Sequence, residues 1–252
     1  MTADEYLQGI LAREAVNTGP YSPVLGVQTQ IRPIIQEWAG IRLLSLSPSG
    51  SFAKGTANKS GTDIDLFISL SHETTETLKE IYESLVAKMS AKGYTPKRQN
   101  VSINVTVTGY SVDLVPGKRQ DTTSDDHSLY RRKANTWTKT NVRRHITYVV
   151  QGGRINESRI LKLWRDQKGL DFPSFYLELI VIAALAGYNR GVAANVMKVF
   201  EYLRDTFPTA RVVDPANTNN IISDDLTASE RATVKAAATL ARQARDWGEI
   251  VK

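Results

Sequence analysis

The spacing of apolar residues changes twice along the chain. Residues 3–17 and 22–40 repeat apolar side chains every three to four positions, which predicts two helices. From residue 41 to residue 115, short runs of branched and apolar residues are separated by turns, which indicates strands. After residue 156 the helical repeat continues almost to the end. The pattern therefore predicts an α+β protein in which a sheet-bearing part is followed by a helical part.

The expected elements are bounded by turn and cap residues. We expect strands at residues 41–46, 63–70, 94–100, 101–108 and 110–115, and further helices at residues 74–92, 157–168, 175–187, 195–206 and about 227–247. Residues 117–151 are polar and show little periodicity, and we expect them to connect two lobes and form one wall of a cleft. Residues 212–220 are rich in turn formers, which predicts a connecting segment.

The 252-residue chain has a formal net charge of +6 and contains no cysteine. A chain of this length fits one large domain or two small lobes that share a cleft. The absence of cysteine excludes disulfides, thiolate metal sites and cysteine nucleophiles, and it fits a cytoplasmic protein. No apolar run is long enough to span a membrane, and the acidic, amphipathic start of the chain is unlike a signal peptide.

Positive charge is concentrated in one segment. Residues 117–168 contain 13 lysine and arginine residues against 5 aspartate and glutamate residues. A basic segment that follows acidic strands suits a polyanionic substrate. A nucleoside triphosphate accounts for this charge, and so does a nucleic acid; a solvated basic surface is the third interpretation.

Two carboxylates share one face of an otherwise apolar strand. Alternate side chains of a strand point the same way, so Asp63 and Asp65 face one side while their apolar neighbours face a core. Adjacent carboxylates repel each other, and Mg²⁺, which is bound by one or two carboxylates together with substrate phosphates, offsets that repulsion. The preceding turn at Gly50 and Ser51 offers backbone N–H groups to phosphates. The alternative is a capped helix followed by a strand with two solvated aspartates.

Asp113 lies in the last of the expected strands. Val112 and Leu114 are apolar and face the core, so Asp113 faces the opposite side together with Ser111. Taken alone, an aspartate in this setting is an ordinary edge-strand residue.

The stretch from Gly50 to Leu70 resembles a known signature. A Gly-Ser turn followed about a dozen residues later by Asp-x-Asp on a strand is found in DNA-polymerase-β-like nucleotidyltransferases. The fuller string, GSFAKGT and then TDIDLF, is most similar to the cyclic-oligonucleotide synthases of bacterial anti-phage systems (the CD-NTases). Their branch also holds cyclic GMP–AMP synthase, oligoadenylate synthetase and the archaeal CCA-adding enzymes.

The resemblance implies a fold and a division of the chain. It implies a polymerase-β-like palm, which is a mixed sheet with helices, plus a helical second lobe, with the active site in the cleft between them. Residues 1–150 are then the catalytic lobe with an N-terminal spine helix. Residues 151–252 are a helical lobe like that of oligoadenylate synthetase and CCA-adding enzymes.

The resemblance also assigns metal ligands. In this family a third carboxylate comes from a neighbouring strand, in an apolar-Asp-apolar-Val-Pro motif that Asp113 matches. Asp63, Asp65 and Asp113 are then catalytic and hold two Mg²⁺ or Mn²⁺ ions, while Gly50 and Ser51 position the phosphates.

Two further residues match the second-lobe signature of this branch. Lys162 in RILKLW and Ser174 in PSFYLELIV match a lysine and a serine that reach the β- and γ-phosphates. A solvated helix lysine and a helix-capping serine are the alternatives.

The implied activity is metal-dependent nucleotidyl transfer from nucleoside triphosphates, with a cyclic or linear oligonucleotide second messenger as the leading product. The first alternative is a tRNA CCA-adding or other RNA-terminal enzyme, and the second is a catalytically silent nucleotide-binding module. The expected partners are nucleoside triphosphates, with nucleic acid as an optional activator or acceptor, a protein regulator left open, and no membrane. The base preference, the linkage and the acceptor hydroxyl are not determined by these motifs.

Overall fold

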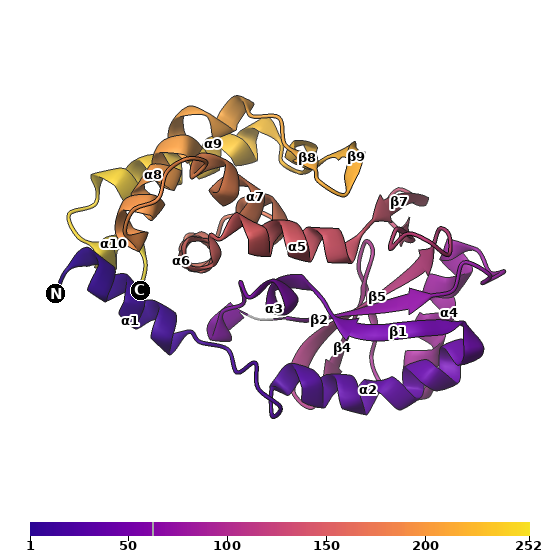
Figure 1. Ribbon diagram of the computed structural model, residues 1–252. Helices are drawn as coiled ribbons and strands as arrows, with labels where there is room; N and C mark the ends of the chain where they lie inside the picture. Colours follow the sequence, from indigo (N-terminus) through magenta and orange to yellow (C-terminus); the bar gives the residue numbers. More distant parts are fainter. Residues whose placement is uncertain (62) are drawn as a thin grey trace. The chain divides into compact units, whose positions relative to one another are not determined.

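The computed structural model describes residues 1–61 and 63–252 (Figure 1), and its contacts divide them into two compact units. The sheet unit comprises residues 17–54 and the described residues from 63 to 146. The helical unit comprises residues 1–16, 55–61 and 147–252. We expected the division near residue 150, with the whole N-terminus in the catalytic lobe. The structure instead assigns residues 1–16 and 55–61 to the helical unit, since they hydrogen-bond and pack within it.

A mixed sheet organises the sheet unit. In the described residues its strands lie in the order β1-β2-β5-β4-β3, and β6 pairs with the end of β5 and with β7. Only the β2–β5 pair is parallel among these pairings. The strands are β1 (Leu43–Pro48), β2 (Ile64–Leu70), β3 (Lys97–Arg98), β4 (Ile103–Val107), β5 (Tyr110–Arg119), β6 (His127–Arg131) and β7 (Thr136–Thr140).

One face of this sheet is covered by two helices, α2 (Pro23–Ala39) and α4 (Leu78–Ala91). Alternate residues of the central strands join the helices in one apolar cluster, which includes Leu66, Leu114 and Ile31, each fully buried. Burying side chains of this size contributes roughly 1.5–3 kcal/mol each. Because strand side chains alternate, this packing turns the intervening residues of β2 and β5 to the other face of the sheet.

Local signals explain where these helices begin. Ser22 caps α2 and Pro23 occupies its first position, where the missing N–H costs nothing. Thr77 and Glu80 form a capping box at the start of α4. Pro33 lies inside α2, and the helix continues past it.

The segment that shows little periodicity in the sequence is largely regular in the structure. Residues 117–151 contain the end of β5, the β6–β7 hairpin and most of α5 (Val142–Gly152), which are elements that we did not predict. The expected cleft wall stays a prediction. The expected strand at residues 94–100 is reduced to the two residues of β3. The hairpin is short and carries exposed polar side chains, which hides its alternation, whereas α5 has apolar residues at Val142, Ile146 and Val149 that signal a helix.

The helical unit packs around large apolar and aromatic side chains. Trp164 lies 5.0 Å from Phe200, and Phe172 lies 5.1 Å from Tyr176, measured between ring centroids. The helices are α1 (Ala3–Arg13), α6 (Ile155–Gln167), α7 (Ser174–Ala184), α8 (Val192–Asp205), α9 (Ala228–Gln243) and α10 (Trp247–Ile250). The turn-rich segment near residue 215 forms a small hairpin of β8 (Val213–Asp214) and β9 (Asn217–Ile221).

The mixed sheet with helices and the separate helical unit confirm the predicted α+β class. Within the part of the chain that the structure describes, no helix combines the length and apolar character needed to cross a lipid bilayer.

Candidate active site

Asp65 and Asp113 lie side by side on the two parallel strands. The register of β2 and β5 places Asp65 directly beside Asp113. Their neighbours Ile64 and Leu114 are at most 1% exposed and face the apolar core, whereas the two aspartates are partly exposed on the opposite face. Neighbouring strands are about 4.8 Å apart, so the two carboxylates occupy one small patch. The alternation of the sequence thus leads to a shared acidic face.

Asp63 adds a third negative charge to this patch. It is exposed and lies one residue before the start of β2. Burial raises the pKa of Asp113 above its ordinary value, a hydrogen bond from Asn104 opposes that rise, and the charge of Asp63 raises the pKa further. An effect of Asp63 on this pKa requires the two carboxylates to be near each other. The structure therefore brings all three predicted aspartates into one region.

The predicted phosphate turn is in direct contact with the acidic patch. Gly50 has a φ of +55°, and a Cβ atom added to it would lie 1.7 Å from Oδ2 of Asp65. The preceding Ser49 donates its backbone N–H to the carbonyl oxygen of Asp65 at 2.8 Å. Both the left-handed backbone and the lack of space require glycine at position 50. Ser51 follows in α3 (Gly50–Lys54), a short helix that packs on β2.

Three polar side chains that we did not anticipate hold Asp113. Asn104 donates to Oδ1 of Asp113 at 2.8 Å and Gln99 donates to the same atom at 3.2 Å, while Ser102 donates to Oδ2 at 3.3 Å. Asn104 lies opposite Asp113 in the β4–β5 register. Its position between Ile103 and Val105 was the available signal, because a polar residue between buried ones must face the acidic side of the sheet.

The donor set of this patch fits a hard divalent cation. Its three carboxylates supply oxygen ligands, and neutral groups rather than lysine or arginine form the hydrogen bonds described for Asp113. As the described side chains stand, no three histidine, cysteine, aspartate or glutamate groups surround a single point closely enough to hold a metal. The fit to a cation therefore rests on the chemistry of the three carboxylates.

Lys162 and Ser174 belong to the helical unit and have partners there. Lys162 on α6 is 4% exposed, and its Nζ lies 2.6 Å from Oε1 of Glu178. Ser174 accepts a hydrogen bond from Arg165 Nη1 at 2.8 Å. Ser174 is the first residue of α7 and Pro173 is its cap, so the alternative role of Ser174 as the helix cap is wrong by one position. The expected contacts of both side chains with phosphates stay a prediction.

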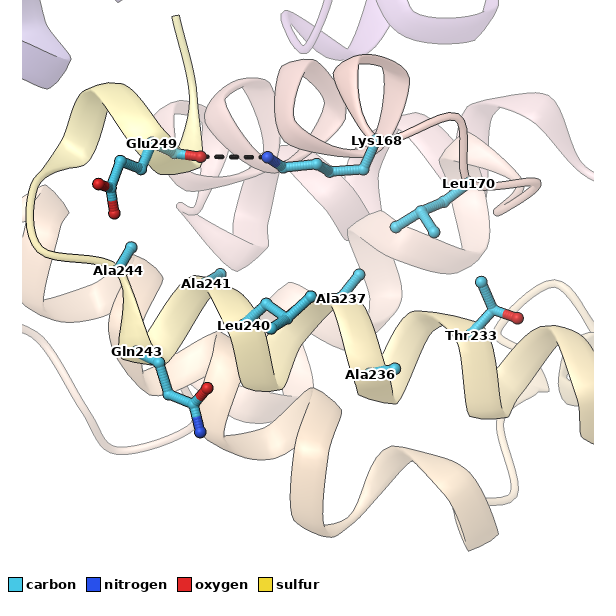
Figure 2. Close-up of a pocket in the computed structure, with 10 residues that line it drawn as sticks. All are labelled: Lys168, Leu170, Thr233, Ala236, Ala237, Leu240, Ala241, Gln243, Ala244 and Glu249. Atoms are coloured by element: carbon cyan, nitrogen blue, oxygen red, sulfur yellow. Dashed lines mark hydrogen bonds between the residues drawn. The ribbon is translucent and has the colours of Figure 1, made fainter.

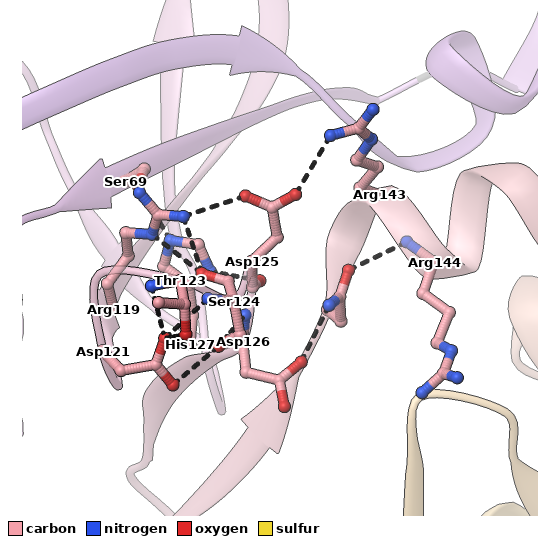
Figure 3. Close-up of polar contacts among 11 residues, drawn as sticks. Ser69, Arg119, Asp121, Thr123, Ser124, Asp125, Asp126, His127, Arg143 and Arg144 are labelled. Atoms are coloured by element: carbon pink, nitrogen blue, oxygen red, sulfur yellow. Dashed lines mark hydrogen bonds and ion pairs between the residues drawn. The ribbon is translucent and has the colours of Figure 1, made fainter.

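A second polar cluster lies on the same sheet face, further along β2 (Figure 3). His127 Nε2 lies 2.8 Å from Ser69 Oγ, and His127 Nδ1 lies 2.8 Å from the carbonyl oxygen of Asp125. Burial lowers the pKa of His127, which keeps the ring neutral. Arg119 binds the carbonyl oxygen of Ser124 and the carboxylate of Asp125. The cluster fixes the turn between β5 and β6 and makes no described contact with the three aspartates.

The helical unit also contains a hollow between α9 and the end of α6 (Figure 2). Its volume is about 600 Å³, and Leu170, Leu240 and Ala241 are among its mostly apolar lining residues. Lys168 crosses its rim and donates to the carbonyl oxygen of Glu249 at 3.1 Å. None of the predicted site residues lines it.

Comparison with known proteins supports the class suggested by this geometry. Residues 30–136 match the family model of the nucleotidyltransferase domain. The Cyclic AMP-AMP-AMP synthase of Escherichia coli (strain MS 115-1) is 23% identical over 211 residues, which cover 74% of this chain and 65% of that protein. The chain thus spans less than two thirds of that relative's length.

Two solved structures share the fold over nearly the whole chain. The Bradyrhizobium diazoefficiens CD-NTase CdnG in complex with GTP is 14% identical with a TM-score of 0.77, covering 98% of this chain and 94% of that one. The Cid1 poly(U) polymerase with Mg and 3′-dATP bound is 12% identical with a TM-score of 0.71, covering 97% of this chain and 95% of that one.

Residues 30–136 match the nucleotidyltransferase domain model, and the fold of nearly the whole chain is similar to that of a CD-NTase, which confirms the resemblance seen in the sequence. The chain shares its fold with CD-NTases and with a poly(U) polymerase. A shared fold does not determine the acceptor, which has to be decided by other means.

Proposed function

We propose that this protein is a metal-dependent nucleotidyltransferase that joins nucleoside triphosphates into a cyclic or linear oligonucleotide, as a second messenger in anti-phage defence. The observation that carries the proposal is the acidic patch, in which Asp65 and Asp113 pair in register beside the Gly50 turn. The curated relative is named as a synthase of a cyclic trinucleotide, which supports the product class.

The proposed reaction is attack by a hydroxyl oxygen on the α-phosphorus of a nucleoside triphosphate. The new bond is a phosphodiester, the bond to the bridging oxygen breaks, the hydroxyl loses its proton and pyrophosphate leaves. Asp63, Asp65 and Asp113 are the residues that would hold two Mg²⁺ ions. When bound, such ions neutralise the triphosphate and lower the pKa of the attacking hydroxyl.

The remaining residues of the patch orient these groups. Asn104, Gln99 and Ser102 fix the carboxylate of Asp113, so its oxygens are aimed before substrate arrives. Gly50 brings the turn against Asp65, and we propose that backbone N–H groups at Gly50 and Ser51 contact the phosphates. The magnesium and 3′-dATP in the Cid1 structure support metal and triphosphate as ligands of this fold.

The second candidate function is nucleotide addition to the end of an RNA, including tRNA. It is favoured by the poly(U) polymerase, whose fold matches 97% of the chain. Against it stands the curated relative, whose sequence is 23% identical and whose product is a small cyclic oligonucleotide.

One incubation separates these functions. The purified protein is mixed with the four radiolabelled triphosphates and Mg²⁺ or Mn²⁺, with and without tRNA, and the products are treated with phosphatase. Phosphatase-resistant small products without tRNA support the synthase, and label only in tRNA supports the terminal transferase. Absence of incorporation under every condition contradicts both and favours a silent nucleotide-binding module.

A further inference from the structure

The loop between the phosphate turn and the first catalytic aspartate belongs to the helical unit. Residues 55–61 are assigned there by their contacts, although α3 precedes them and Asp63 follows them within the sheet unit. Each end of this loop is therefore covalently joined to a predicted site segment, with Ser51 four residues before it and Asp63 two residues after it. Whatever holds the loop limits where those two residues can move.

A buried ion pair holds the start of the loop. Lys162 donates to Glu178 Oε1 at 2.6 Å and to the hydroxyl and carbonyl oxygens of Thr56 at 2.9 and 3.3 Å. The hydroxyl of Thr56 also donates to Glu178 Oε1. Thr56 and Glu178 are fully buried and Lys162 is 4% exposed. The loop threonine thus hydrogen-bonds both members of a charge pair that is almost wholly buried.

Further hydrogen bonds hold the rest of the loop. Asn58 donates to the carbonyl oxygen of Arg159 at 2.9 Å and accepts from its Nε at 3.1 Å. The backbone N–H groups of Lys59 and Ser60 donate to the carbonyl and carboxylate oxygens of Glu14 at 3.1 and 2.9 Å. Side chains from α6 and the residue that follows α1 therefore fix the loop at successive positions.

Stabilising the fold does not by itself account for the buried ion pair. Desolvating two charges costs several kcal/mol per ion, and well-packed apolar residues in the same place often give equal or greater stability. What the pair supplies instead is a specific geometry, because the Thr56 hydroxyl accepts a hydrogen bond from Lys162 and donates one to Glu178.

We propose that Lys162, Glu178 and Thr56 form a loop anchor that positions Ser51 and Asp63 for nucleotidyl transfer. The proposal rests on the proposed function for its catalytic consequence, and it gives Lys162 a positioning role in place of a phosphate contact. A charge that is already matched by Glu178 attracts a triphosphate less than an unpaired lysine does.

Two variants test the anchor. Thr56→Val keeps the side-chain shape and removes the hydroxyl, and Lys162→Met/Glu178→Leu removes both charges together, which protects the fold from an unpaired buried charge. Thr239→Val is the matched control, since its hydroxyl donates to Lys235 at 2.8 Å on the exposed surface of α9. Hydrogen exchange of residues 50–63 and steady-state kinetics are measured for each.

If the anchor holds the loop, hydrogen exchange in residues 50–63 should be about tenfold faster in both test variants, as expected for the loss of a buried hydrogen bond. The exchange rate of the control should equal that of the wild type. The anchor also predicts a similar drop in kcat with KM for nucleotide nearly unchanged, because misplaced groups slow the chemical step more than binding. Unchanged exchange in both variants overturns the anchor.

A phosphate-binding Lys162 gives a different result. KM then rises in the double variant and stays normal in Thr56→Val, and this outcome also overturns the anchor. If the wild-type protein transfers no nucleotide, the exchange result still decides whether the loop is anchored, and only the proposed function fails.

Discussion

Two clusters of charged side chains in this protein combine their charges in opposite ways. In the loop anchor, Lys162 and Glu178 neutralise each other and share the hydroxyl of Thr56. In the acidic patch, Asp65 and Asp113 lie side by side, and the charge of Asp63 raises the pKa of Asp113. The first cluster pairs two opposite charges, whereas the second brings three carboxylates into one region.

The difference supports the acidic patch, rather than the loop anchor, as the proposed cation site. Like charges on neighbouring strands cost free energy, and a fold retains them where a bound cation offsets that cost. The Lys162–Glu178 ion pair instead holds the loop in position. Substitutions in the acidic patch should therefore lower activity more than stability, and breaking the ion pair should mainly lower stability.

The largest expected effect is the loss of activity in Asp65→Asn. Losing several kcal/mol of metal-dependent stabilisation should lower the rate by about a thousandfold or more. The free energy of unfolding should stay the same or rise by up to about 1 kcal/mol, because a repulsion is removed. Labelled-triphosphate turnover and urea denaturation measure the two quantities.

Asp224→Asn is the control for this change, because Asp224 is exposed in the helical unit. It should leave turnover and stability near those of the wild type. A normal rate for Asp65→Asn with Mg²⁺ or Mn²⁺ would falsify the metal site.

The next effect is on stability and comes from breaking the matched pair. Lys162→Met leaves Glu178 buried without its lysine, which should lower the free energy of unfolding by about 3–5 kcal/mol. Lys162→Met/Glu178→Leu should recover most of this loss. As a surface control, Lys198→Met removes a pair with Glu201 that is 38% exposed, and should cost less than about 1 kcal/mol. Equal stability losses in the single and double variants would contradict the matched-pair interpretation.

The sequence predicted the parts of the fold that repeat an apolar pattern. Strand β2 and helices α2 and α4 follow from alternation, helical spacing and caps, since their buried residues form one cluster. The β6–β7 hairpin was missed because β7 is mostly polar and exposed or half-buried, and because His127 of β6 contacts Ser69, 58 residues away. Contacts between residues so far apart in the sequence produce no local sequence pattern from which they could be predicted.

The same distinction applies to the site. The shared face of Asp65 and Asp113 followed from alternation, and the family signature pointed to the Gly50 turn. The partners of Lys162 did not follow, because Thr56 and Glu178 join it from a loop and another helix. Residue types indicated the chemistry, and only the structure shows which charges are already paired.

The smallest expected effect concerns the groups that aim Asp113. Asn104→Ala removes a hydrogen bond that holds the pKa of Asp113 down, while burial and the charge of Asp63 continue to raise it. An aspartate with a raised pKa stays protonated to a higher pH, and metal binding requires the deprotonated carboxylate. The acid limb of Mn²⁺ binding should therefore shift to higher pH, with an affinity loss of about tenfold or less at neutral pH.

Titrations of Mn²⁺ at a series of pH values, followed by electron paramagnetic resonance, measure the shift. Thr106→Ala, at an exposed position of the same strand, should leave the limb in place. An unshifted limb in Asn104→Ala would mean that Asp113 is oriented by the strands alone, because the hydrogen bond would then have no measurable influence on its carboxylate.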